Sequence, residues 1–341
     1  MKSLKALVVV GLLFAIGCGG STAFRSGKVY YEKNKDYVKA EEMFKQAIEE
    51  EPQNWEAHLY LALALAQQEK YAEAEESFTY AREIAPEDKK ELVYGNQHKF
   101  FVDNYNQGIT RNSTKNYDEA VEFFKKAVAV EPTYAKGHVN LGVAYSMLGE
   151  NDKALAAFQE AVRVDPTSVE AWENLGITYQ AMREYTKARE AFAKMVELDP
   201  DNVNGKYALA DMYFNEGNHE KALEFYEQTA ETQTDDPALQ YQIGASNFSL
   251  EDYSEAAMAF QKAAALAKDS DVDLYRDSMY NLAICYLRLE EYEAARATTE
   301  RLLELGETAD MYELLGRILS KMGLKDEAIK AYEKAKELEG E

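Results

Sequence analysis

Alanines recur along most of this chain at a spacing of 34 residues, which is the feature that most restricts how the chain can fold. The spacing changes only where 12 or 5 residues are inserted or one is lost, and the alanines are Ala40, Ala74, Ala120, Ala154, Ala188, Ala222, Ala256, Ala295 and Ala328. An aromatic residue follows most of them four positions later: Phe44, Phe78, Phe124, Phe158, Phe192, Tyr226, Phe260 and Tyr332. A fixed period of this size predicts a solenoid, in which each repeat buries its apolar face only against its neighbours.

The repeat at residues 169–202 shows the pattern most completely. Its first half predicts an amphipathic helix, because one stripe at helical spacing contains Trp172, Leu175, Gly176 and Tyr179. A second stripe contains Ala188 and Phe192, and Pro200 ends it because proline cannot continue a helix. Small residues such as Gly176 and Ala188 allow two antiparallel helices to cross closely.

This pattern resembles the tetratricopeptide repeat (TPR) over about residues 21–341. The resemblance implies an all-α fold, a right-handed superhelical solenoid of about nine helix-turn-helix repeats. In the first repeat, Gly27 and Lys28 align with Leu175 and Gly176. We expect the array to fill residues 24–341, with repeats near 21–54, 55–88, 101–134, 135–168, 169–202, 203–236, 237–270, 276–308 and 309–341, and with insertions at 89–100 and 271–275.

The N-terminus predicts an export signal, because a basic start is followed by a short apolar run that ends at small residues. The boundary Ala-Ile-Gly-Cys at residues 15–18 resembles the lipobox of bacterial lipoproteins. That resemblance implies a cleaved signal at 1–17, a lipid on Cys18 and a tether at 18–23. Gly19 after the cysteine implies the periplasmic face of the outer membrane in the bacterial cell envelope. The alternative is an ordinary cleaved signal in which Cys18 is incidental.

Composition limits the function classes. The formal net charge of −23 repels phosphate backbones and anionic lipid heads, so we expect no nucleic-acid partner and no membrane contact beyond the lipid. The repeats leave no stretch for a catalytic domain, so we expect no enzyme activity, small-molecule substrate or cofactor. Asp269, Asp271 and Asp273 have the opening spacing of a calcium loop, but Leu274 replaces its glycine and Tyr280 its closing glutamate, so we expect no metal site.

Isolated cysteine and histidine side chains predict no chemistry of their own. Cys285, in the middle of a predicted helix, is expected to be a small buried hydrophobic residue. The histidines have no mutual spacing and are expected to be local packing or surface residues: His58, His98, His138 and His219.

One position of the first helix carries a primary amide in most repeats: Asn106, Asn140, Asn174, Gln242 and Asn281. This row resembles the asparagine ladder on the concave face of peptide-binding TPR arrays, including those of O-linked N-acetylglucosamine transferases. A carboxamide both donates and accepts hydrogen bonds, so it can pair with a peptide backbone whatever the side chain. The alternative is hydrogen bonding between repeats. The neighbouring inward positions carry Glu170, Glu173 and Asp211 as well as Lys136, so we do not expect a C-terminal carboxylate ligand.

Aromatic residues suggest a second part of the same binding face. Tyrosine gives a large amphipathic contact area, and we expect these concave aromatics to bind peptide: Tyr105, Tyr207, Tyr241, Tyr280, Phe214 and Phe248. For the tyrosines the alternative is packing against the next helix.

Two irregular regions stay open to interpretation. Residues 89–100 predict either a lengthened first helix or a functional protrusion hinged at Gly95, and the insertion near Asp271 is expected to bend the array. The last repeat has no extra polar capping helix, so an apolar end that includes Ile329, Ala335 and Leu338 is a candidate for self-association.

These features favour a non-catalytic, membrane-anchored adaptor that holds extended segments of other proteins during envelope complex assembly. An accessory subunit that recruits or regulates a cell-envelope enzyme, such as a cell-wall hydrolase or transferase, is the alternative. A mainly structural protein that uses its convex side is a third possibility. The partner itself is not predicted.

Overall fold

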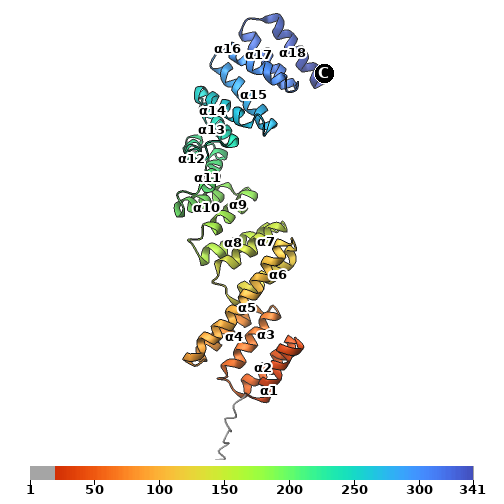
Figure 1. Cartoon of the computed structure of the whole chain (residues 1–341), viewed down its shortest axis with the longest axis vertical. Coiled ribbons are helices and arrows are strands. Elements are labelled where there is room, and N and C mark those ends of the chain that lie inside the picture. The colour runs from red at the N-terminus through yellow and green to blue at the C-terminus, as the bar shows by residue number, and fades with distance from the viewer. Residues whose placement is uncertain (1–19, 341) are drawn as a thin grey trace, which may run out of the picture. The chain divides into compact units, whose positions relative to one another are not determined.

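The computed structural model describes residues 20–340, so the predicted signal at 1–17 and Cys18 lie outside the described residues. Consecutive helices form antiparallel hairpins (Figure 1), which confirms the predicted all-α TPR fold. The chain divides after Pro166 into two compact units, which we describe separately. Unit 1 contains α1 (Thr22–Val29), the π-helical turn η1 (Tyr30–Asn34), α2 (Tyr37–Glu50), α3 (Trp55–Gln67), α4 (Tyr71–Ile84), α5 (Glu87–Ser113), α6 (Tyr117–Val130), α7 (Ala135–Met147) and α8 (Asn151–Val164).

Unit 2 is built from the same kind of hairpin. Its helices are α9 (Val169–Ala181), α10 (Tyr185–Leu198), α11 (Val203–Asn215), α12 (His219–Ala230), α13 (Pro237–Ser249), α14 (Tyr253–Ala267), α15 (Val272–Arg288), α16 (Tyr292–Leu303), α17 (Ala309–Lys321) and α18 (Lys325–Glu339).

Most hairpins are closed by a small residue on the first helix and a ring on the second; the eighth repeat has Thr299 in place of the ring. In six repeats a Cβ atom added to the glycine would lie only 2.6–2.8 Å from an atom of that ring, at Gly27, Gly108, Gly142, Gly176, Gly244 and Gly316. The rings opposite are buried except for Tyr332, which is half-buried; Phe192, for example, is 1% exposed. The 34-residue pattern therefore reports this helix-crossing contact.

The first repeat corrects the sequence alignment. The alignment placed Lys28 at the small position, but Gly27 packs against Phe44 there. Gly27 precedes Phe44 by 17 residues, whereas Gly176 precedes Phe192 by 16. The π-helical turn at Tyr30–Asn34 follows Gly27, and such a turn accommodates one extra residue without ending a helix.

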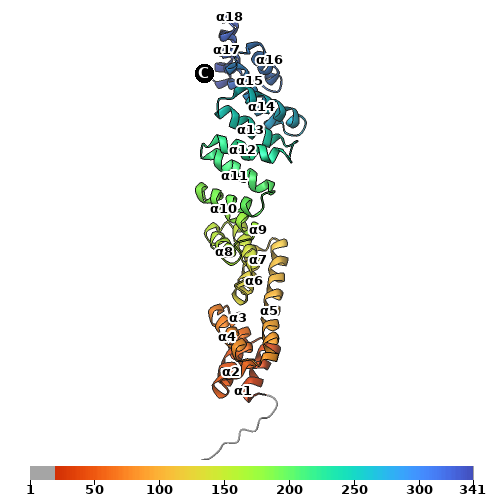
Figure 2. The same ribbon diagram turned by 90° about the vertical axis from the view of Figure 1, so that its left-hand side faces the viewer.

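Residues 89–100 lie inside one helix, α5, which has 27 residues (Figure 2). An aromatic stripe follows this helix, with ring centroids 5.5–6.0 Å apart between the successive members Tyr94, His98, Phe101 and Tyr105. Gly95 has no atom within 4 Å of the position that a Cβ would take. The helix is continuous through Gly95, so the structure shows a lengthened helix here and no hinge.

The second insertion also lengthens a first helix, because α15 has 17 residues and begins at Val272. Asp271, which we considered as part of a calcium loop, caps this helix by accepting a hydrogen bond from the backbone N–H of Leu274 at 3.0 Å. The sequence suggested an apolar end surface that includes Ile329 and Ala335 of the last helix. Ile329 is 54% exposed, but Ala335 is buried and is not part of such a surface.

Candidate functional site

The predicted amide and tyrosine rows meet each other across adjacent repeats. In unit 1, Asn140 Nδ2 of α7 donates to Tyr105 Oη of α5 at 3.0 Å, and also to the backbone oxygen of Lys136 at 2.9 Å. Tyr105 packs in turn on Phe101 and Phe124, so its ring is fixed by neighbouring aromatics. The two rows, which we predicted separately, therefore form one inter-repeat contact at this position.

Unit 2 repeats the arrangement. Asn281 Nδ2 of α15 donates to Tyr241 Oη of α13 at 3.1 Å. Tyr207 of α11 is hydrogen-bonded to the Gln242 side chain of α13, and burial raises the pKa of Tyr207 to about 12. A tyrosine of one repeat thus holds the amide of the next. We call Tyr105–Asn140, Tyr207–Gln242 and Tyr241–Asn281 the Tyr–amide pairs.

Three residues of the predicted amide and tyrosine rows fall outside these pairs. Tyr280 packs in the apolar cluster that contains Leu314, which occupies the amide position of the last repeat. Asn174 Nδ2 donates to the backbone oxygen of Glu170 in its own helix at 2.8 Å. Asn106 is exposed and lines a cavity of about 510 Å³ in unit 1.

The two predicted phenylalanines lie near the ends of first helices in unit 2. Phe214 makes an edge contact with His219, at 5.0 Å between ring centroids, and Phe248 makes one with Tyr253 at 5.4 Å. Both are half-buried and pack against the first turn of the following helix. They contribute to the closure of their own hairpins and keep part of each ring accessible.

The Tyr–amide pairs change what the amides offer to a ligand. The side-chain nitrogens of Asn140 and Asn281 already donate to tyrosine hydroxyls. Within the described part of the chain, their carbonyl oxygens accept no hydrogen bond. These amides are therefore oriented acceptors, suited to the N–H groups of an extended peptide.

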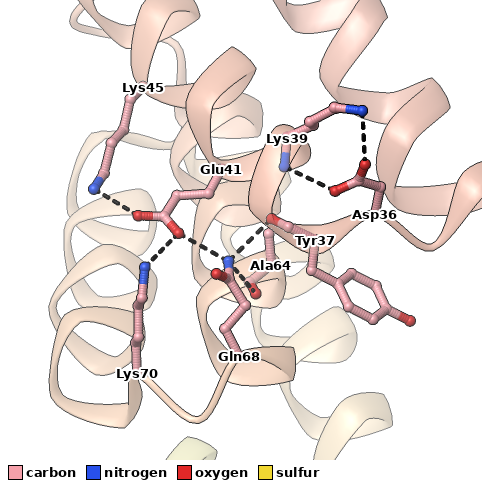
Figure 3. Close-up of polar contacts among 8 residues, drawn as sticks. All are labelled: Asp36, Tyr37, Lys39, Glu41, Lys45, Ala64, Gln68 and Lys70. Carbon is pink, nitrogen blue, oxygen red and sulfur yellow. Dashed lines mark hydrogen bonds and ion pairs between the residues drawn. The ribbon is translucent and has the colours of Figure 1, made fainter.

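Sequence reasoning missed a buried carboxylate in the first two repeats (Figure 3). Glu41 is only 7% exposed, and its two oxygens accept from Lys45 Nζ and Lys70 Nζ at 2.7 Å each and from Gln68 Nε2 at 2.8 Å. Gln68 Nε2 also lies 3.0 Å from the backbone oxygen of Tyr37. Burial alone would raise the pKa of Glu41, but these hydrogen bonds lower it to about 2. The cluster links α2 to the turn between α3 and α4.

A second polar pair replaces part of the usual packing in the sixth repeat. Tyr226 is fully buried at the ring position, and its hydroxyl donates to the Asp211 carboxylate of α11. Burial raises the pKa of both groups, and the hydrogen bond to Asp211 raises that of Tyr226 further. Most other repeats carry an apolar residue at the Asp211 position, such as Ile177, and this difference was the available sequence signal.

The remaining titratable side chains have local roles. Cys285 is fully buried, as predicted, and burial raises the pKa of its thiol to about 12. His138 Nε2 lies 2.8 Å from the backbone oxygen of Pro132, and His58 Nε2 lies 3.1 Å from that of Pro52.

Among the residues that the structure describes, no His, Cys, Asp and Glu side chains are grouped so as to hold a metal ion. Over residues 20–340, no helix has the length and apolarity needed to cross a bilayer.

The stacked hairpins define an all-α repeat protein whose accessible surfaces are helix faces. Models of the tetratricopeptide repeat match residues 24–89, 139–203, 179–242, 235–308 and 309–341, and a TPR-repeat model matches residues 110–149. The chain belongs to the tetratricopeptide repeat family. This fold is typically a non-catalytic scaffold for protein–protein interaction, and membership supports that general role.

Several solved structures are similar to parts of the chain. The MamA protein is 24% identical over 50% of this chain and 93% of its own, with a TM-score of 0.48. YrrB, described as a TPR protein with an unusual peptide-binding site, is 21% identical over 53% and 91%, with a TM-score of 0.49. A tetratricopeptide repeat protein from Parabacteroides merdae is 19% identical over 70% and 93%, with a TM-score of 0.49. A comparison with curated protein sequences gives no significant match.

Proposed function

We propose that this protein is a non-catalytic adaptor, anchored by a lipid on Cys18 in a bacterial cell envelope, that binds extended segments of partner proteins. The family supports the scaffold role, and the residue pattern at 15–18 supports the anchor. Binding takes place on the first helices of the repeats, which carry the predicted amides. Assembly of envelope complexes is the process that such an anchored adaptor serves.

The observation that carries the binding proposal is the repeated Tyr–amide pair. In two of the pairs the tyrosine hydroxyl fixes the nitrogen of the asparagine amide, at Asn140 and Asn281, and leaves the carbonyl oxygen as an acceptor. An extended peptide has a row of backbone N–H donors at regular spacing, and preorganised acceptors bind such a row with little loss of side-chain entropy. Within each unit, the pairs therefore favour recognition of the peptide backbone over recognition of one particular side chain.

The test is crosslinked capture of partners from native membranes. We compare wild type with the triple variant Asn106→Ala/Asn140→Ala/Asn174→Ala, after circular dichroism has shown equal helicity. We expect the triple variant to lose the partners that wild type retains, because it removes three amide acceptors. The matched control is Gln46→Ala/Gln228→Ala, which removes an exposed amide from the second helix α2 and a half-buried one from the second helix α12 and should leave capture unchanged.

A second variant distinguishes the loss of peptide binding from the loss of the hydrogen bond between repeats. Tyr105→Phe removes the hydroxyl of one Tyr–amide pair but keeps the Asn140 carbonyl oxygen. It should weaken capture less than Asn140→Ala does. Unchanged capture by the triple variant would contradict the proposed face and direct attention to the second helices.

The anchor is tested independently. Mass spectrometry of the mature protein should show a lipid on Cys18, and Cys18→Ser should lack it and leave the membrane fraction. A wild-type N-terminus without lipid, at any residue after the apolar run, would instead support the ordinary cleaved signal.

A further inference from the structure

A small cavity of about 180 Å³ lies beside the inserted part of α5 in unit 1. Its lining includes Arg82 of α4, Tyr94 and Gln97 of α5, and Glu131 just after α6. Two of these residues, Tyr94 and Gln97, come from the segment 89–100 that lengthens this helix relative to the regular repeat. The cavity is therefore distinct from the Tyr–amide pairs and particular to this part of the chain.

Gln97 gives the cavity a hydrogen-bond acceptor that no described residue satisfies. Its side chain is 5% exposed, and Nε2 donates to the backbone oxygen of Val130. That bond fixes the orientation of the amide, because the carbonyl of Val130 can only accept. Oε1 is buried and has no partner among the described residues. A buried acceptor in this state requires a donor from outside the chain.

The surroundings of Gln97 favour a donor that is positively charged. The Glu131 side chain is 11% exposed, and its Oε1 lies 2.9 Å from His98 Nδ1. Glu75 supplies a second carboxylate to the lining. Val130 is the last residue of α6, and the carbonyl end of a helix carries a partial negative charge. Two acidic residues, a glutamine with an unpaired oxygen and a helix end therefore line one small volume.

Arg82 is the only cation among the described residues that line the cavity. Its Nη2 lies 3.3 Å from Thr79 Oγ1 on its own helix, and it forms no ion pair with Glu75 or Glu131 within the described chain. Tyr94 of α5 lines the cavity with a side chain that is 51% exposed. An aromatic side chain at this position suits a ligand with an apolar stem and a cationic tip.

We propose that this cavity binds the ammonium group of a lysine side chain from a partner protein. An ammonium group has three N–H donors, which match the Gln97 oxygen and the Glu131 carboxylate. The four-carbon stem of the lysine lies along Tyr94. The net charge of −23 favours the approach of a basic partner segment over an acidic one.

The test uses the mature full-length protein with selectively ¹⁵N-labelled glutamine, so that the Gln97 side-chain resonance reports directly on the cavity. The probe is n-butylammonium, and tetramethylammonium is its control because it carries the same charge without an N–H donor. We expect n-butylammonium to shift the Gln97 resonance saturably and tetramethylammonium to leave it unchanged. The buried Gln240 of unit 2 serves as an internal reference.

Two variants test whether the Glu131 carboxylate supplies the negative charge that binds the ammonium group. Glu131→Gln should weaken n-butylammonium binding by about tenfold, because a charge-assisted hydrogen bond becomes a neutral one. Glu122→Gln, on α6 outside the cavity lining, is the matched control and should change binding less than about twofold. Equal binding of tetramethylammonium, or equal effects of the two variants, would overturn the proposal and leave the cavity as a water site.

The source of the ammonium group is tested with two further ligands. A capped tripeptide with a central lysine should shift Gln97 at lower concentration than n-butylammonium does, and this shift should depend on Glu131. Spermidine represents free cellular amines. Tighter Glu131-dependent binding of spermidine than of the tripeptide would overturn the assignment to a protein partner.

Discussion

At the scale of single residues, the sixth repeat shows how one buried hydroxyl is accommodated. Tyr226→Phe removes the donor to Asp211 and leaves that carboxylate without its partner in a half-buried position. We expect a loss of about 1–3 kcal/mol in the free energy of unfolding, measured by urea denaturation. The double variant Tyr226→Phe/Asp211→Ile introduces the residue types that the fifth repeat has at these positions, Phe192 and Ile177, and should recover most of that loss. A neutral single variant would show that the pair contributes nothing to stability.

Glu41 supplies a pH-dependent contribution to the stability of unit 1. Its pKa falls from an ordinary value of 4.5 to about 2 in the folded protein, so folding favours the ionised form. The contribution is therefore complete above about pH 4.5 and is lost as the pH falls towards 2. We expect Glu41→Gln to lower the free energy of unfolding by about 2 kcal/mol near neutral pH, with the difference shrinking on acidification. Thermal unfolding at several pH values measures this, and a pH-independent difference would contradict it.

At the scale of the helical element, the contact between small residue and ring determines whether a hairpin closes. A Cβ on Gly176 would lie 2.6 Å from the Phe192 ring, so Gly176→Ala should destabilise the protein by about 1–2 kcal/mol despite the better helix propensity of alanine. Gly95→Ala is the matched control, because a Cβ there meets nothing within 4 Å. We expect it to stabilise by about 0.5–1 kcal/mol. Thermal denaturation should therefore show shifts of opposite sign for the two variants.

The helix boundaries of two regions could not be predicted from the sequence. One residue inserted in the first repeat leaves the apolar stripe nearly intact, and the π-helical turn at Tyr30–Asn34 restores the register. The 12 residues at 89–100 could be interpreted in two ways, because both flanking segments favour a helix. Continuity through Gly95 was decided by the aromatic stripe of α5, which neighbouring helices contact.

At the scale of the whole molecule, a repeat protein is stabilised by contacts between neighbouring hairpins, so a large piece should fold without the rest. We expect residues 167–341 to retain native helicity and a cooperative thermal transition when produced alone. A polypeptide that begins at residue 183 is the control, because that cut leaves Phe192 without Leu175 and Gly176. It should lose part of the helicity expected for its length. An unfolded 167–341 fragment would contradict the division into two compact units.

The sequence determined the fold class and the composition of most hairpins, because the small residue and the ring that pack together recur at fixed positions of the 34-residue repeat. It also identified the amide and tyrosine positions, since both follow the period. Only the tertiary structure showed that Asn140 and Asn281 are held by tyrosines of the preceding repeat, because residues 35 and 40 positions apart meet only when the hairpins stack. The buried Glu41 cluster and the cavity at Gln97 arise for the same reason. Their members come from different helices at irregular spacing, so no periodic signal marks them, and only packing brings their charges and hydrogen-bonding groups together.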